Sequence, residues 1–209
     1  MNIINKLSSS HNRRDQLPNQ ELAEEIVNTA DRQSIKELVS HLSHKNKAIQ
    51  NDCIKVLYEI GEQNPQLISE YFNDFVQLLD SSNNRLQWGA MTALNAITLE
   101  VPTEVFDALI KILDTAERGS IITKDHAVGI LIKLCSVKQF ADHTFSLLME
   151  LLLKSSTNQL PMYAERALPA IAVDNKALFI RTLNSRLNEI EKESKRKRVE
   201  KVIRKASLI

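Results

Sequence analysis

The stretch "NNRLQWGAMTALNAI", residues 83–97, contains the pattern that decides the fold. Leu86, Ala90 and Leu94 recur every four residues, which places them along one face of an α-helix. Trp88 is the single tryptophan of the chain, and it does not share that face. The stretch therefore predicts an amphipathic helix with a buried aliphatic stripe and an aromatic side chain on another face.

The same stripe recurs along the chain at a fixed interval. When the sequence is shifted against itself by 37 residues, three apolar columns align. Repeats of this length are typical of stacked helical hairpins. The columns hold a small residue (Cys53, Ala90, Ala127, Ala164), a leucine (Leu57, Leu94, Leu131, Leu168) and an isoleucine or leucine (Ile60, Ile97, Leu134, Ile171). Each block thus repeats the buried stripe of one helix.

A second helix is predicted ahead of each stripe, because Ile35, Leu38, Val39 and Leu42 map by the same shift onto Phe72, Phe75, Val76 and Leu79. Pro65 maps onto Pro102, and proline is well tolerated in the first turn of a helix. The polar residues Asn46, Asn83, Ser120 and Thr157 are candidate N-caps of the stripe-bearing helices. The predicted pairs are 31–43 with 46–62, 66–80 with 84–99, 103–117 with 121–136, and 139–154 with 158–173.

Two helices of this size cannot bury their apolar faces alone, so neighbouring pairs must stack. A helix near 20–29 precedes the pairs, and helices at 175–190 and 195–206 form a closing pair. We therefore predict one all-α solenoid domain over residues 1–209. Residues 1–18 form an N-terminal segment expected to be flexible, residues 19–173 the repeats, and residues 174–209 a C-terminal cap with a basic helix.

The segments "AIQNDCIKVLYEI", "LQWGAMTALNAI" and "LPMYAERALPAI" resemble HEAT repeats of the armadillo-like superfamily, over about residues 30–173. The resemblance implies a right-handed α-α superhelix of about four to five hairpins with capping helices, whose second helices line a concave groove that holds a protein or peptide. One element of the HEAT pattern is missing, the loop aspartate and helix arginine that form a ladder. Those places hold Asn46, Asn83, Ser120 and Thr157, and Gln50, Gln87, Lys124 and Pro161.

The composition excludes several classes of function. Lys plus Arg (27) nearly balances Asp plus Glu (26), so we expect no global field that would gather nucleic acid or anionic membrane. The chain has only 4 glycines and no phosphate-binding loop motif. No apolar run suits a signal peptide or a membrane span. Cys53 and Cys135 lie among apolar helical positions, which favours buried thiols and a cytoplasmic location.

Candidate catalytic groups are few. His41 and His44 lie three residues apart near a helix end, where capping or solvation explains them better than a metal site. Asp125, His126 and His143 supply a carboxylate and imidazoles, but no nucleophile accompanies them. The iron-binding hydroxylases of HEAT-like build carry His-Glu pairs, and no histidine here precedes a glutamate. We expect no enzyme activity, no cofactor and no metal.

The best candidate for a binding site is the groove face. Trp88 is off the buried stripe, and tryptophan, methionine and arginine often anchor interfaces. The alternative is that Trp88 covers the seam between repeats and is mostly buried. The predicted partner-binding residues are Asn51, Lys55, Trp88, Met91, Thr92, Asp125, Met162 and Arg166.

A second candidate is the segment "EKESKRKRVEKVIRKASLI", residues 191–209, which predicts a basic amphipathic helix. Its basic patch comprises Lys195, Arg196, Lys197, Arg198, Lys201, Arg204 and Lys205. A terminal cap with a solvated charged face is the simpler interpretation. The leading hypothesis is thus a scaffold that binds a protein or peptide. The alternative is a HEAT-like nucleic-acid-binding protein, including a DNA-glycosylase-like enzyme, that uses the basic helix and the groove.

Overall fold

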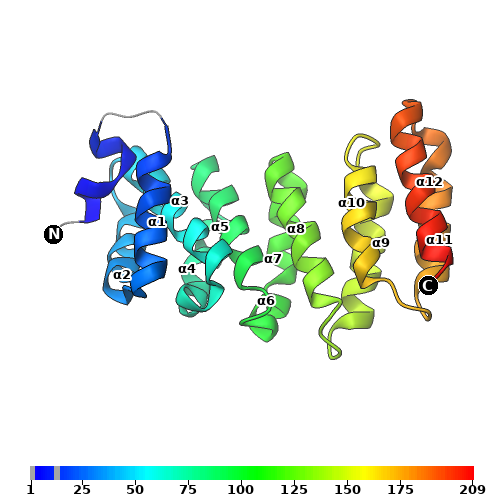
Figure 1. The fold of residues 1–209 in the computed structure, drawn as a ribbon, viewed down its shortest axis with the longest axis horizontal. Helices are drawn as coiled ribbons and strands as arrows, with labels where there is room; N and C mark the ends of the chain where they lie inside the picture. Colours follow the sequence, from blue (N-terminus) through cyan, green and yellow to red (C-terminus); the bar gives the residue numbers. More distant parts are fainter. Residues whose placement is uncertain (1–2, 12–14) are drawn as a thin grey trace. The chain divides into compact units, whose positions relative to one another are not determined.

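The computed structural model describes residues 3–11 and 15–209, and in these ranges the chain forms helices and no strand (Figure 1). The chain divides into two compact units, Met1–Ala127 and Val128–Ile209. The boundary falls inside α8 (Ile121–Leu134). The other helices of the first unit are α1 (Leu17–Thr29), α2 (Arg32–Ser40), α3 (Lys47–Gln63), α4 (Phe72–Leu78), α5 (Asn84–Ile97), α6 (Pro102–Asp107) and α7 (Leu109–Arg118). The second unit contains α9 (Ala141–Lys154), α10 (Leu160–Ala167), α11 (Lys176–Arg186) and α12 (Glu193–Ser207).

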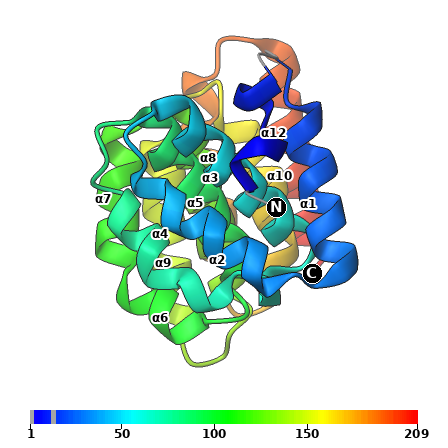
Figure 2. The same cartoon turned by 90° about the vertical axis from the view of Figure 1, so that its left-hand side faces the viewer.

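Helices in the first unit pack as successive hairpins. In one row α3 packs against both α1 and α5, while α2 packs on α3 and α4 packs on α5 (Figure 2). In the second unit α11 packs on α9, and α12 packs on α10 and α11. The predicted alternation of two helices per repeat is therefore confirmed within each unit.

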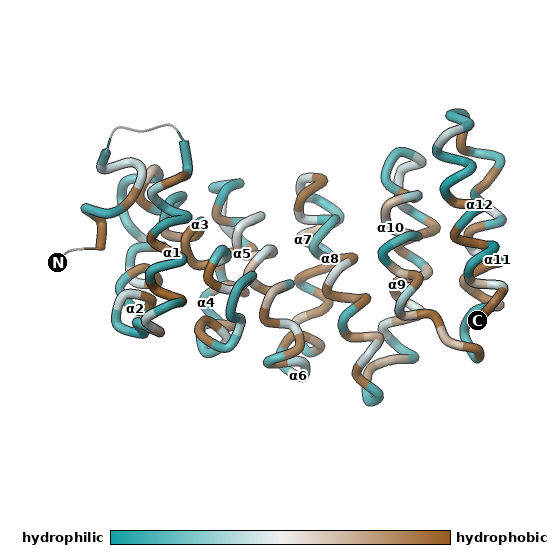
Figure 3. The backbone as a smooth tube through the Cα atoms, in the orientation of Figure 1, coloured by the Kyte–Doolittle hydropathy of each residue, from teal (hydrophilic) through white to brown (hydrophobic). Residues whose placement is uncertain are grey.

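The three apolar columns of the repeat form the core. Cys53, Ala90, Ala127 and Ala164 have no exposed surface, and the leucine and isoleucine columns are also buried, with the exception of Leu168. Leu168 is half-buried because α10 ends just before it and a short 3₁₀ turn, Leu168–Ala170, follows. Figure 3 shows the resulting alternation of hydrophobic and hydrophilic residues along the helices.

The first helices of two repeats differ from the prediction, because neither 66–80 nor 103–117 is one continuous helix. The first consists of two 3₁₀ turns, Pro65–Leu67 and Ser69–Tyr71, followed by α4. The second consists of α6 and α7, with a break at Ala108. Val105 before the break and Leu109 after it are both buried, at the spacing that a continuous helix would also give.

The predicted N-caps are confirmed at three of four positions. Asn46 Oδ1 accepts from the Ala48 amide at 2.9 Å, and Asn83 Oδ1 accepts from the Arg85 amide at 3.1 Å. Ser120 Oγ lies 3.4 Å from the Thr123 nitrogen. The prediction for Thr157 is wrong, because α10 begins three residues later, at Leu160. Pro161 fits the first turn, where its missing N–H costs nothing, and so fixes this later start.

A neutral amide ladder occupies the place of the missing Asp–Arg ladder. The Gln50 side chain donates to the His44 carbonyl at 2.8 Å, and the Gln87 side chain donates to the Leu79 carbonyl at 3.0 Å. Asn83 Nδ2 joins consecutive repeats by donating to Gln50 Oε1 at 3.0 Å and to Asn51 Oδ1 at 2.9 Å. The Asn and Gln positions therefore align the repeats without charge.

Residues 3–11 pack against the first hairpin. They form two 3₁₀ turns, Ile3–Lys6 and Ser8–His11, and both Ile3 and the intervening Leu7 are buried. The buried Asp52 carboxylate accepts from the Ser9 amide at 2.7 Å and from Asn19 Nδ2 at 2.8 Å. The predicted flexible segment also includes residues 1–2 and 12–14, which lie outside the described residues.

The closing helices of the second unit are tied to the earlier ones by two arginines. Buried Arg186 on α11 donates to the carbonyls of Leu152, Leu153 and Ser155 at the end of α9, at 2.6 to 3.0 Å. Arg198 on α12 forms two hydrogen bonds to the Glu165 carboxylate on α10, at 2.9 and 2.6 Å. Val199, Val202 and Ala206 form the buried face of α12.

Candidate functional site

The first unit carries an aromatic pair on the row formed by α3 and α5. Trp88 is half-buried, and its ring lies 5.6 Å from the ring of buried Tyr58 at an interplanar angle of 51°. The two helices approach closely because Gly89 follows Trp88; a Cβ at Gly89 would lie 2.6 Å from Ile54 Cγ1. Trp88 therefore has a fixed aromatic neighbour and keeps part of its surface accessible.

Lys55 extends the aromatic pair. Its Nζ lies 4.8 Å from the centroid of the Tyr58 ring and forms an ion pair with Glu59 on the next turn of α3. Burial lowers the pKa of Lys55, but the hydrogen bonds that its ammonium donates to Glu59 and Tyr58, with the nearby charges, outweigh burial and raise the pKa overall. Burial raises the pKa of Tyr58, which the hydrogen bond from Lys55 opposes. The Lys55 ammonium and the neutral Tyr58 side chain thus hold each other in place.

His126 at the start of α8 is held by two polar side chains of α5. The Thr92 hydroxyl donates its proton to the Trp88 carbonyl at 2.9 Å, so its oxygen must accept from His126 Nε2, which lies 3.0 Å away. Asn95 Nδ2 lies 3.2 Å from His126 Nδ1. The neutral imidazole with its proton on Nε2 satisfies both contacts. The ring is therefore fixed in orientation and in tautomer.

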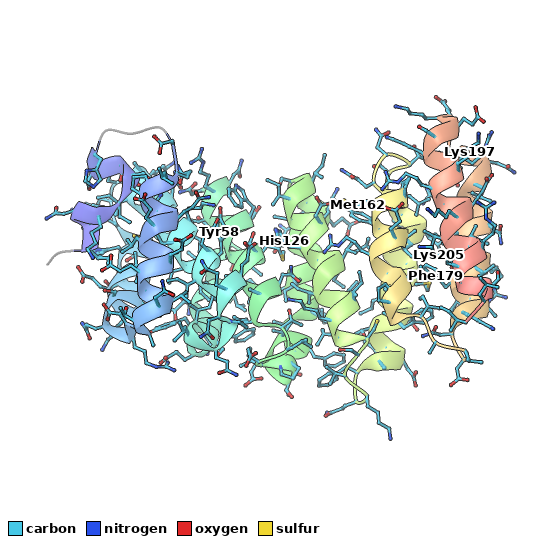
Figure 4. The ribbon with its side chains drawn as sticks, in the orientation of Figure 1. Tyr58, His126, Met162, Phe179, Lys197 and Lys205 are labelled. Carbon is cyan, nitrogen blue, oxygen red and sulfur yellow. The ribbon has the colours of Figure 1, made fainter. Side chains whose placement is uncertain are left out.

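We call this set of six residues the Trp88 surface: Lys55, Tyr58, Trp88, Thr92, Asn95 and His126. Figure 4 labels Tyr58 and His126 within it. Three of its members are groove residues named from the sequence, namely Lys55, Trp88 and Thr92, and of these Thr92 is buried and supports the others from below. The structure brings these three together across neighbouring helices.

The other predicted groove residues have different positions. Asn51 is half-buried and accepts from Asn83, and Asp125 is half-buried near the start of α8. Met91 is fully buried, because it occupies the repeat position equivalent to Ile54 and faces the neighbouring repeat. Met162 and Arg166 are half-buried on α10 of the second unit. Met91 therefore belongs to the core rather than to a binding surface.

Sequence reasoning missed Tyr58 and Asn95 as surface members. They follow Lys55 and Thr92 by three residues, so they lie on the same helical face, and they occupy equivalent repeat positions. This three-residue spacing, repeated in both helices, was enough to predict Tyr58 and Asn95 as members of the same face. His126 was considered only as a catalytic group, and its hydrogen bonds to Thr92 and Asn95 show a positioning role instead.

The described residues contain no group of three or more His, Cys, Asp and Glu side chains placed to hold a metal ion. His41 and His44 contact each other edge to face, with ring centroids 5.8 Å apart, and His44 Nδ1 accepts from the Asn46 amide. Among the same residues, no helix has the length and apolar character needed to span a bilayer. Cys53 and Cys135 are free thiols.

The residues of the predicted basic patch fall into two groups. Lys195 donates to Asn158, Arg198 pairs with Glu165, Lys197 pairs with Glu193, and Arg196 lies 4.0 Å from Glu200. Lys201, Arg204 and Lys205 are exposed. Arg198 therefore attaches α12 to α10 and Lys195 attaches it to the turn before α10, whereas Lys201, Arg204 and Lys205 extend into solvent.

Comparison with known proteins places the fold among armadillo and HEAT solenoids. A designed armadillo repeat protein for modular peptide recognition is 16% identical, with a TM-score of 0.67 over 98% of both chains. A designed armadillo repeat protein in complex with the peptide (KR)4 is 18% identical, with a TM-score of 0.63 over 98% of this chain and 97% of that one. An engineered protein that is 21% identical superposes with a TM-score of 0.58 over 97% of this chain and 99% of that chain.

Sequence comparison adds one relative. An uncharacterized protein of Methanocaldococcus jannaschii is 30% identical over 112 residues, which is 51% of this chain and 53% of that protein. The chain thus matches about half the length of this curated relative. No protein-family model matches the sequence. The fold is an all-α solenoid of the armadillo and HEAT type.

Proposed function

We propose that the protein is a non-enzymatic scaffold that binds a protein or peptide on the Trp88 surface. The observation that carries the proposal is the partly exposed tryptophan packed on Tyr58. Partly exposed tryptophans with rigid surroundings are the residues that most often dominate binding energy. A preorganised ring also loses little conformational freedom on binding.

Two exposed apolar side chains lie on other helices of the row that carries Trp88. Ile122 on α8 is 42% exposed and lies one turn before Asp125, and Leu17 on α1 is 47% exposed. These side chains offer apolar contacts on the same row of helices as Trp88. The hydrogen bonds among Thr92, Asn95 and His126 hold α5 and α8 in place beside them.

The structural neighbours support a role in peptide binding by analogy of fold. One was designed for modular peptide recognition, and another is in complex with the peptide (KR)4. A shared fold supports the binding mode and leaves the ligand open, because function depends on the site. The free thiols of Cys53 and Cys135 support a reducing compartment such as the cytoplasm.

The test is selection from a random linear peptide library on the full-length protein. Enriched peptides should bind the wild type and lose at least about tenfold in affinity for Trp88→Ala, the loss that corresponds to about 1.4 kcal/mol. Tyr71→Ala is the matched control, because Tyr71 is a half-buried aromatic residue on the opposite row of the first unit.

Circular dichroism of both variants must show wild-type helicity. Equal binding of the enriched peptides to the wild type and to Trp88→Ala would contradict the proposal. So would equal losses in the Trp88 and Tyr71 variants. Failure to enrich any peptide above an unrelated helical protein would contradict it as well.

A further inference from the structure

The near-zero net charge of the chain is the sum of two opposite charges. The unit Met1–Ala127 contains 12 Lys and Arg against 18 Asp and Glu, a formal net charge of −6. The unit Val128–Ile209 contains 15 against 8, a net charge of +7. The overall balance noted from composition therefore does not describe the field around either unit.

Much of the positive charge of the second unit lies on α12, and its cations are of two kinds. Lys195 is bound to Asn158 in the turn before α10, and Arg198 is bound to Glu165 of α10, so they attach the helix. Lys201, Arg204 and Lys205 are exposed and form no ion pair or hydrogen bond with the described residues. The charges of Lys201 and Lys205 contribute to lowering the pKa of Glu165, so their interaction with that carboxylate is long-range. A cation without a direct ion pair gives up no short contact when it binds an anion.

The exposed cations form a line. Lys197, Lys201, Arg204 and Lys205 lie at i, i+4, i+7 and i+8, on the face of α12 opposite Val199, Val202 and Ala206. Figure 4 labels Lys197 and Lys205 along the helix. Eight residues of α-helix extend about 12 Å, which spans roughly three to four phosphates along one strand of a duplex. Lys197 is the weakest member, because Glu193 pairs with it.

We propose that this line of cations binds the phosphate backbone of nucleic acid without reading its sequence. A linear cation array matches a linear polyanion. Insertion of α12 into a membrane is disfavoured, because its apolar residues Val199, Val202 and Ala206 are buried against α10 and α11, which leaves half-buried Ile203 and exposed Leu208 and Ile209 as the accessible apolar side chains. The line contains no aromatic, asparagine or glutamine side chain to read bases, so contacts go to phosphates alone. This surface is independent of the Trp88 surface.

The test is fluorescence anisotropy of a short labelled DNA duplex, with the same sequence as single-stranded RNA in a second arm. Binding should be weak at physiological salt, with Kd in the region of about 10⁻⁴ M, and should tighten as salt is lowered. The logarithm of affinity should fall with the logarithm of salt with a slope of roughly −3, because about three phosphates are neutralised. Scrambling the sequence should change nothing.

The diagnostic variant is Lys201→Gln/Arg204→Gln/Lys205→Gln. At about 50 mM salt it should bind at least about tenfold more weakly, with a slope near zero. The control Lys45→Gln/Lys138→Gln/Lys154→Gln removes the same charge from other exposed positions and should bind like the wild type. Both variants should keep wild-type helicity, because none of the six side chains is buried.

Three results would overturn the proposal. The first is the absence of binding to either nucleic acid at about 50 mM salt. The second is equal binding by the α12 variant and the control variant. The third is binding to phosphatidylserine vesicles at lipid concentrations where neither nucleic acid binds, which would assign the line of cations to a membrane surface.

Discussion

Gly89 and Trp88 are adjacent on α5 and determine the candidate site together. Gly89 lets α5 approach Ile54 of α3, and that approach places the Trp88 ring against Tyr58. Glycine inside a helix normally costs about 1 kcal/mol relative to alanine. Close helix packing gives this glycine a structural role that compensates for its poor helix propensity.

Gly89→Ala should therefore destabilise the protein despite the higher helix propensity of alanine. The new Cβ would lie 2.6 Å from Ile54 Cγ1 and 3.2 Å from Ile54 Cγ2, and overpacking of this kind costs about 1 to 3 kcal/mol. Chemical denaturation followed by circular dichroism measures the change. Trp88 emission should also shift as the helices separate. An increase in stability would show that α3 and α5 are not in close contact.

Cys53 is completely buried in the small-residue column of the repeat. Burial, followed by the nearby Asp52 and Glu37 carboxylates, raises the pKa of its thiol to about 12. Since the thiolate is the reactive form, Cys53 should resist thiol reagents at neutral and mildly alkaline pH. Half-buried Cys135 should react slowly, and both thiols should react in denaturant. Prompt reaction of two thiols in the native protein would contradict the packing of the first unit.

Individual helices differ in how far the sequence predicts them. The stripe-bearing helices α3, α5 and α8 follow the repeat closely, because core residues recur at one spacing and an Asn or Ser side chain marks each start. The breaks before α4 and between α6 and α7 had no local signal. Ala108 is not a helix breaker, and the buried residues on both sides of it keep ordinary helical spacing, so neither explains the break.

Arg186 was not identified from the sequence, because its partners are main-chain carbonyls of a distant helix. Arg186→Ala would leave the carbonyls of Leu152, Leu153 and Ser155 without this donor and should cost about 3 kcal/mol or more. Arg186→Lys should recover less than half of the stability lost in Arg186→Ala, because a lysine ammonium cannot reproduce the planar array of donors of the arginine guanidinium. Thermal denaturation measures both. A loss below about 0.5 kcal/mol for the alanine variant would contradict the assigned role.

The ion pair that attaches α12 to α10 should weaken at low pH, when the Glu165 carboxylate becomes protonated. The hydrogen bond from Arg198 lowers the pKa of Glu165 below its usual value of 4.5. The pair therefore stabilises the protein fully above the ordinary carboxyl pKa, and the contribution is lost as the pH falls through the lowered pKa.

Glu165 is exposed, so Glu165→Gln should cost less than about 1 kcal/mol near neutral pH. The difference in unfolding free energy between the wild type and Glu165→Gln should vanish at low pH. Unfolding curves at several pH values measure it, and a difference that persists unchanged into strong acid would contradict the pairing.

At the scale of the whole molecule, the sequence predicted the class of fold and only part of the site. The repeat was visible because stacked hairpins impose one spacing on the core. The Trp88 surface was only half predicted, because Tyr58, Asn95 and His126 become neighbours through packing between repeats. The division of charge between the two units was hidden by the whole-chain total.

The central claim is that a partner chain binds over Trp88, and the single tryptophan makes a direct measurement possible. A ¹H–¹⁵N spectrum of the labelled protein contains one indole N–H signal, which can be followed while an enriched peptide from the library is added. We predict that this signal shifts progressively and saturates with the binding curve. An unchanged indole signal during saturable binding, with backbone shifts confined to other helices, would contradict the account.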